Sequence, residues 1–307
     1  MTQNHRHRVI VTSGLGNQLF QFAFGHYIAK KLKSRILIEN KPTSGSTPHV
    51  KFLLDDLMNF CTHIDLKKHF TIGHDSLIER FLYRSKLAGY WENFVLKNKN
   101  YIKITDSDIH LFVPSNKKST IENYSFDGFW QDWKFVDLVS TSVIEDLITF
   151  LDKKIIMHNQ HKSIFLKNLV IHIRRGDYLY PRFKGFFGVI KTDSYLPVIK
   201  QIKLENPGII ITTLTDDIDL LKKENIGMNF GTIIDPRQSN PWEALKIMTN
   251  ADYLITANSS LSWWGGYLCM NKGGVVYVPK PWFQNENAPK FEHYMHPQFN
   301  IYEANFY

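Results

Sequence analysis

Short aliphatic runs alternate with longer amphipathic stretches along the chain, and this pattern predicts strands followed by helices. The N-terminal part shows it first. Residues 8–12 predict a strand, helical spacing over 19–33 predicts an amphipathic helix, and residues 35–39 predict a second strand. A strand, turn, helix and strand of these lengths are typical of a βαβ unit.

The second half of the chain repeats this alternation. Aliphatic runs followed by turn residues predict strands at 169–173, 208–215, 232–234, 253–257 and 275–278. Asp193 or Ser194 is expected to cap one intervening helix, and Asn240 followed by Pro241 is a helix start. Strands and helices in this order predict an α/β fold with a parallel, doubly wound sheet.

The region between the two halves is less regular. Residues 41–50 predict a loop, residues 51–118 predict only short elements, and the aromatic run within 121–136 predicts a strand leading into a helix that ends near residue 151. Its aromatic side chains are more often core residues than sugar platforms. The polar stretch 153–168 is the expected linker.

Length and composition set the domain number and the class of partner. With 307 residues and 43% hydrophobic content, the chain exceeds the usual size of a single core, which predicts domains at 1–160 and 161–307. The net charge of +8 favours an anionic partner: nucleotide phosphate, nucleic acid or an acidic membrane surface. Because no nucleic-acid recognition motif is present, we expect no nucleic acid as partner, while peripheral membrane association stays open.

The two cysteines, Cys61 and Cys269, lack the spacing of a disulfide framework or a zinc site. The polar start of the chain has no apolar signal segment, and no stretch has the roughly 18 apolar residues that span a bilayer. We therefore expect a cytoplasmic protein.

The predicted strand at 169–173 delivers charge to its carboxyl end, where Arg174, Arg175 and Asp177 follow. In open α/β sheets this edge binds ligands, and two adjacent guanidinium groups match the oxygens of a phosphate. A polyanionic ligand is the predicted partner. The alternative is a surface salt-bridge cluster that contributes little.

A second candidate anion site follows the strand at 253–257, where residues 258–262 combine hydroxyl groups with the start of a helix. Simple capping by serine and asparagine is the alternative. Asp216, Asp217 and Asp219 follow another strand; hydrogen bonding at the strand end and helix capping explain them, so we expect no metal.

Gly14 and Gly16 begin a GxGxxG pattern, and Glu39 ends the next strand, as in a dinucleotide site. Leu19 occupies the third glycine position and argues against NAD. What remains is a turn whose backbone amides approach a ligand, or a tight turn with Asn17 as helix cap.

Three segments together resemble the α-1,2-fucosyltransferases of glycosyltransferase family 11, which use GDP-fucose. The first is 13–23, in which Ser13 replaces a glycine of the family pattern; the others are 172–177 and 252–264, and 128–131 is a weaker echo. The resemblance implies a GT-B type fold of two Rossmann-like domains. GDP-fucose would bind the parallel sheet of the C-terminal domain, and the acceptor would lie on the N-terminal side.

The resemblance also assigns roles, with His172, Arg174, Arg175, Ser259 and Ser260 around the diphosphate, Asp252 at the guanine edge and Asn17 facing the fucose-phosphate region. Taken with the turn residues, the expected donor-binding set is Gly14, Gly16, His172, Arg175, Asp252, Asn258, Ser259 and Ser260, and the expected catalytic set is Asn17, Arg174 and Asp177.

The expected reaction is an inverting transfer of fucose to the 2-hydroxyl of a terminal galactose in surface polysaccharide or O-antigen synthesis. Arg174, Arg175 and the helix start at Ser259 would neutralise the departing diphosphate without a metal or other cofactor. Asp177 is the candidate base, or else an ion-pair partner that orients an arginine. The alternative function is a noncatalytic nucleotide-sugar or glycan-binding protein on the same scaffold.

Overall fold

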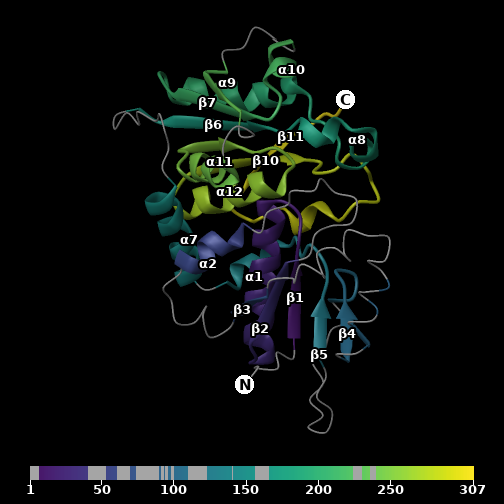
Figure 1. Ribbon diagram of the computed structural model, residues 1–307. Helices are drawn as coiled ribbons and strands as arrows, with labels where there is room; N and C mark the ends of the chain where they lie inside the picture. The colour runs from purple at the N-terminus through teal and green to yellow at the C-terminus, as the bar shows by residue number, and fades with distance from the viewer. Residues whose placement is uncertain are drawn as a thin grey trace. The chain divides into compact units, whose positions relative to one another are not determined.

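The computed structural model describes residues 7–40, 53–60, 70–73, 90, 93, 96–97, 100–109, 123–139, 141–155, 166–223, 230–235 and 240–307 (Figure 1). The chain divides into two compact units, Met1–Leu147 and Ile148–Tyr307. The expected boundary at residue 160 and most of the expected linker lie outside the described residues, as does the predicted loop at 41–50. The first residues of that linker are helical, because α7 spans Thr141–Lys154.

The first unit is built on a parallel sheet with the strand order β3-β2-β1-β5-β4. Its strands are β1 (His7–Val11), β2 (Ile36–Asn40), β3 (Phe70–Gly73), β4 (Tyr101–Ile104) and β5 (Asn123–Phe126). Its helices are α1 (Leu15–Leu32), α2 (Leu54–Phe60) and α6 (Trp133–Asp137), and α7 begins in it. The predicted βαβ unit at the N-terminus is thereby confirmed.

Two predictions for this unit need correction. Helix α1 begins at Leu15, four residues earlier than expected, because Ser13 adopts a positive φ of 68° and turns the chain directly into the helix. Asn17 therefore lies within α1 and is not its cap. The aromatic run is not one strand: β5 ends at Phe126 and α6 occupies the end of the run, whereas the predicted helix that ends near residue 151 is α7.

The second unit contains a six-stranded parallel sheet with the order β11-β10-β9-β6-β7-β8. The strands are β6 (Asn168–Ile173), β7 (Ile210–Thr215), β8 (Thr232–Ile234), β9 (Tyr253–Ile255), β10 (Val275–Lys280) and β11 (Asn300–Glu303). The strand order is that of the Rossmann fold and reverses direction between β6 and β9. Ligands of such sheets bind at the carboxyl ends of the strands at this switch point.

The helical segments of the second unit connect these strands. They are η2 (Gly176–Leu179), α8 (Pro181–Phe187), η3 (Thr192–Tyr195), α9 (Leu196–Glu205), α10 (Ile218–Lys223), α11 (Pro241–Thr249), α12 (Ser260–Asn271) and η5 (Phe291–His293). The predicted start of α11 is confirmed, because the Asn240 side chain accepts a hydrogen bond from the Trp242 amide. The expected cap of α9 is wrong: Asp193 and Ser194 lie in η3, and α9 begins after Tyr195.

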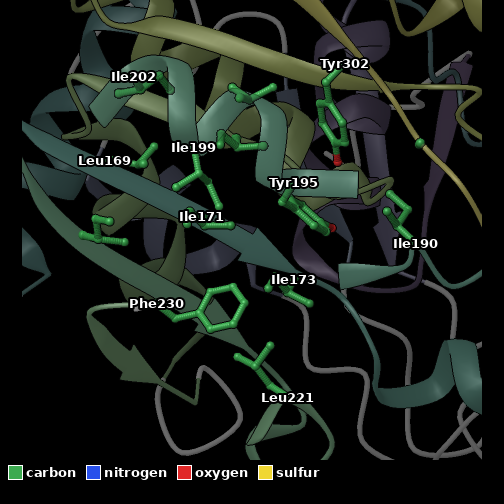
Figure 2. Close-up of a cluster of buried hydrophobic side chains, with 14 residues drawn as sticks. Leu169, Ile171, Ile173, Ile190, Tyr195, Ile199, Ile202, Leu221, Phe230 and Tyr302 are labelled. Carbon is green, nitrogen blue, oxygen red and sulfur yellow. The ribbon is translucent and has the colours of Figure 1, made fainter. Parts of the chain in front are cut away.

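Alternating residues of β6 anchor a buried core on one face of this sheet. Figure 2 shows Leu169, Ile171 and Ile173 grouped with Ile199 and Ile202 of α9. Side chains alternate between the two faces of a strand, so His172 points to the opposite face. The core thus fixes the strand that carries the charged segment. Among the described residues, no helix is long and apolar enough to cross a membrane.

Candidate functional site

The carboxyl ends of three neighbouring strands bring the predicted charged residues of the second unit together. The strand register pairs Ile171 with Ile255 and Ile173 with Thr215. Residues 174–178 after β6, 216–217 after β7 and 258–262 after β9 therefore lie along one edge of the sheet, at its switch point. We call these residues the switch-point rim.

Arg174 lies on this rim with two carboxylate partners. Its Nη1 is 2.7 Å from Oδ2 of Asp216, its Nη2 is 2.5 Å from Oδ1 of Asp177, and its side chain is 30% exposed. The guanidinium also lies over the Tyr178 ring. Burial disfavours the charged form, but Asp216 and Asp177 outweigh it and raise the pKa of Arg174. Arg174 therefore remains a cation that is partly open to a ligand.

Arg175 is fully buried and organises the rim from within. Its guanidinium donates to the Ile190 carbonyl at 2.8 Å and to the Thr192 hydroxyl at 2.8 Å. Its amide donates to Asp216 at 2.6 Å. The structure thus places the two adjacent arginines in different environments: Arg174 on the rim and Arg175 beneath it.

Asp216 is the rim residue whose importance the sequence alone did not indicate. Its carboxylate is almost fully buried and bonds both the Arg174 side chain and the Arg175 backbone. Gly176 has a φ of 29°, and a Cβ atom there would clash with the Asp216 carboxylate. Asp217 caps α10 by accepting from the Leu220 amide at 2.9 Å, which confirms the predicted capping role.

His172 lies at the end of β6 and is 3% exposed. Burial, followed by the charge of Arg174, lowers the pKa of His172 to about 3. The imidazole is therefore neutral at physiological pH. Its Nδ1 atom bonds none of the described residues.

Asn258 shapes the rim through its own hydrogen bonds. Its side-chain amide donates to the Phe187 carbonyl at 2.9 Å, and its backbone carbonyl accepts from the Tyr178 hydroxyl at 2.9 Å. The ring of Tyr178 stacks on Phe187. These contacts tie the segment after β6 to the turn after β9.

Helix α12 opens onto the rim without a capping side chain. Ser259 is its N-cap residue, with extended backbone angles, yet the Ser259 hydroxyl makes no capping bond. Simple capping therefore does not explain this serine. The first N–H groups of a helix have no partner inside the helix, and with the helix dipole they favour an anion. Ser260 is the first residue of α12 and is partly exposed.

Asp252, which was expected at a guanine edge, does not lie on the switch-point rim. It immediately precedes β9, so it lies at the opposite edge of the sheet. There its carboxylate accepts from the Asn168 amide at 2.7 Å, and its own amide donates to the Asn168 side chain at 2.6 Å. This reciprocal pair links the starts of β6 and β9.

The first unit has a switch point of its own, between β1 and β5. Gly14 is exposed, with no atom near the position of a Cβ, and Gly16 lies buried in the first turn of α1. The Asn17 side chain accepts from the Gln131 side chain at 2.6 Å. Gln21 joins the two loops, because its side chain accepts from the Thr12 amide and donates to the Gly128 carbonyl.

The loop after β5 is held in a strained conformation. Trp130 has a positive φ of 54°, is buried and stacks on Phe24. Asp106 accepts from the amides of Phe129 and Trp130 at 2.8 and 2.7 Å. Trp130 is thus a core residue. The side chain of Glu39, the candidate ribose-binding acid, pairs instead with the buried Arg8 at 2.9 Å.

A sequence profile described as "Glycosyl transferase family 11" matches residues 7–303. The chain belongs to this family. It is therefore a glycosyltransferase, and its two parallel-sheet α/β units form the expected GT-B type fold. The switch-point rim is accordingly a candidate donor site of a family 11 enzyme.

Several curated proteins are similar to this chain in sequence. An alpha-1,2-colitosyltransferase of Escherichia coli is 27% identical over 286 residues, covering 92% of this chain and 94% of the relative. The O-antigen biosynthesis glycosyltransferase WbnK of Escherichia coli is 25% identical over 311 residues, covering 91% of this chain and 96% of the relative. Galactoside alpha-(1,2)-fucosyltransferase 1 of Aotus azarae is 24% identical over 112 residues, covering 35% of this chain and 30% of the relative.

Among solved structures, the fucosyltransferase NodZ from Bradyrhizobium matches with a TM-score of 0.48 and 13% identity, covering 87% of this chain and 94% of that one. NodZ alpha-1,6-fucosyltransferase co-crystallised with GDP matches with a TM-score of 0.46 and 12% identity, covering 86% and 92%.

Proposed function

We propose that this family 11 glycosyltransferase transfers L-fucose from GDP-β-L-fucose to the 2-hydroxyl of a terminal galactose, with inversion and without a metal or cofactor. The observation that carries the proposal is the uncapped start of α12 on the same edge of the sheet as Arg174, at the Rossmann switch point. The names of its relatives support α-1,2 transfer of a deoxy sugar and a place in O-antigen synthesis.

The rim suits the leaving group of such a reaction. As the bond between the sugar and the phosphate breaks, negative charge grows on the diphosphate. A guanidinium and oriented amide groups stabilise that charge most where it is greatest, in the transition state. Arg174 and the first amides of α12 supply both kinds of group. Arg175 acts indirectly, by holding the residues beneath the rim.

In the proposed step, the galactose O2 attacks C1 of fucose on the side opposite the diphosphate. The new C1–O2 bond forms as the bond from C1 to the phosphate oxygen breaks, and its electron pair leaves with GDP. The O2 proton passes to the carboxylate of Asp177, whose side chain is 45% exposed. A positioned base of this kind contributes about 10²- to 10⁴-fold.

A carboxylate that accepts from the N–H groups of guanine should lie at the carboxyl ends of the strands, as the diphosphate site does. We propose Asp235 for this contact in place of Asp252. Asp235 directly follows β8, so it lies at the carboxyl end of the strand next to β7. A carboxylate accepts well from the adjacent N–H groups of guanine.

The sugar of the donor is the point on which the relatives differ. Colitose is the 3-deoxy counterpart of L-fucose, so a protein that binds the 3-hydroxyl of fucose discriminates against colitose, whereas one that packs apolar groups there does not. Competition between the two GDP sugars for one acceptor measures this choice directly. A strong preference for GDP-colitose would contradict the proposed donor.

The deciding experiment incubates the protein with GDP-fucose and a small β-galactoside in the presence of EDTA. We expect GDP release and a new α-1,2-linked product identified by NMR, and loss of turnover in Arg174→Ala. Tight GDP binding without any product would instead support the noncatalytic binding protein. Normal turnover by Arg174→Ala would rule out the role of Arg174.

A further inference from the structure

Two carboxylates share the Arg174 guanidinium, and they differ in how firmly they are held. The Asp216 carboxylate lies 2.7 Å from Nη1 of Arg174, and the Asp216 side chain is 3% exposed. The Asp177 carboxylate lies 2.5 Å from Nη2 of Arg174, and the Asp177 side chain is 45% exposed. The bond to Asp216 is therefore shielded from solvent and from a ligand that approaches the rim, whereas the bond to Asp177 is accessible to both.

Asp216 has no freedom to leave its place. Its Oδ1 accepts from the Arg175 amide at 2.6 Å while its Oδ2 bonds Arg174. The backbone of Gly176 packs so closely against this carboxylate that no side chain fits there. Breaking a buried pair leaves an uncompensated charge, which is costly. Asp216 therefore holds Arg174 in every state of the site.

Asp177 is held by much less. Its carboxylate, in the first turn of η2, bonds Arg174 three residues earlier in the chain. Its other oxygen, Oδ2, bonds none of the residues that the structure describes. A partly exposed pair of this kind contributes little to stability, because solvent competes for both partners. A diphosphate carries more charge than one carboxylate and matches the guanidinium geometry.

We propose that Asp216 is the fixed positioning residue of Arg174, and that the donor diphosphate displaces Asp177 from the same guanidinium. The inference rests on the proposed function, since it takes a nucleoside diphosphate as the ligand. Donor binding then breaks one Arg174–Asp177 bond and forms one Arg174–phosphate bond. It also releases a carboxylate beside the reacting centre.

This exchange gives the reaction an order. Before the donor binds, the Asp177 carboxylate is engaged by the Arg174 guanidinium. After displacement this carboxylate is free to hydrogen-bond the hydroxyl group of the acceptor. The proton of the acceptor hydroxyl therefore has a destination only when the donor is in place.

Two substitutions separate the roles, and a third provides a matched control. Asp177→Asn and Asp216→Asn each remove one carboxylate from Arg174. Asp152→Asn removes a carboxylate from the Lys272–Asp152 pair, whose side chains are 31% and 44% exposed, close to the values for Arg174 and Asp177. Lys272 follows the C-terminus of α12, at the end away from the rim.

The measurements are the dissociation constant of GDP by calorimetry, and kcat. For Asp177→Asn we expect GDP to bind about 2- to 5-fold more tightly, since the competing pair is gone, while kcat falls by about 10²-fold or more. For Asp216→Asn we expect GDP binding to weaken by about tenfold or more, because Arg174 loses its support. Asp152→Asn should leave both quantities unchanged.

Weaker GDP binding by Asp177→Asn would overturn the inference, as would unchanged binding in both rim variants. A general structural lesion weakens binding and turnover together, so their opposite movement in Asp177→Asn is specific to the exchange. Should Asp216→Asn fail to fold, Asp177→Asn and its control still decide, because both change only partly exposed carboxylates. If the unmodified protein does not bind GDP at all, the proposed function fails rather than the exchange.

Discussion

Acidification probes the buried imidazole at the end of β6. His172 is 3% exposed, and burial together with Arg174 lowers the pKa of His172 to about 3. In the unfolded chain this pKa returns to about 6.5. Between these two values the unfolded chain binds a proton that the native protein does not. The free energy of unfolding therefore falls as the pH drops through this window.

The size of the effect follows from the two pKa values. Each pH unit inside the window removes about 1.4 kcal/mol of stability for one proton. From pH 7 to pH 5 the loss is about 2 kcal/mol, since the window opens near pH 6.5. Above pH 6.5 both states are neutral, and the contribution of His172 no longer changes with pH.

Urea unfolding of the wild type and of His172→Gln at pH 7 and pH 5 measures this term. We expect the wild type to lose about 2 kcal/mol more than the variant over this interval, because glutamine does not titrate. NMR of the imidazole provides an independent readout, with the neutral form expected down to pH 5. Equal pH dependence of the two proteins, or a protonated His172 in the native protein at pH 5.5, would refute the reasoning.

Three further substitutions test local features. Ser13→Gly should stabilise the protein by about 1 kcal/mol in thermal unfolding, because Ser13 has a φ of 68° that glycine adopts freely; a drop in melting temperature would contradict this. Gly14→Ala should fold normally, since no atom lies near the position of the added Cβ. It should raise the KM of a substrate that approaches this turn, and an unchanged KM for both substrates would exclude such an approach. Tyr178→Phe should cost about 1 kcal/mol of stability through the lost bond to the Asn258 carbonyl, and equal stability of the two proteins would show that this bond contributes nothing.

Sequence patterns predicted the second unit well because its signals are local. The aliphatic run at 169–173 is the strand β6, and the Asn240-Pro241 start of α11 is confirmed, with Asn240 capping the Trp242 amide. Such features depend on residues close in the chain. Strand β11 was not predicted, because it is short and defined by its pairing with β10.

The aromatic run of the first unit shows where local reasoning ends. The sequence predicted a continuing strand, but β5 stops at Phe126. Asp106 bonds the amides of Phe129 and Trp130, more than 20 residues along the chain, and holds them in a turn. No periodicity within the run reveals such a partner.

The candidate site was partly visible in the same way. The rim position of Arg174 follows from its place after a buried strand, and Asp252 precedes a strand, so its place on the opposite edge was also readable. The ion pair of Arg174 with Asp216 could not be read from the sequence, because it depends on the register between β6 and β7. The burial of Arg175 likewise depends on the distant Ile190 and Thr192.

The switch-point rim must bind a nucleoside diphosphate if the protein works as proposed, and a crystal structure with GDP tests this most directly. We predict diphosphate oxygens on the first amides of α12 and on the Arg174 guanidinium, with Asp216 still bonded to Arg174 and Asp177 released from it. GDP bound elsewhere in the second unit, with Arg174 still bonded to both carboxylates, would contradict the account.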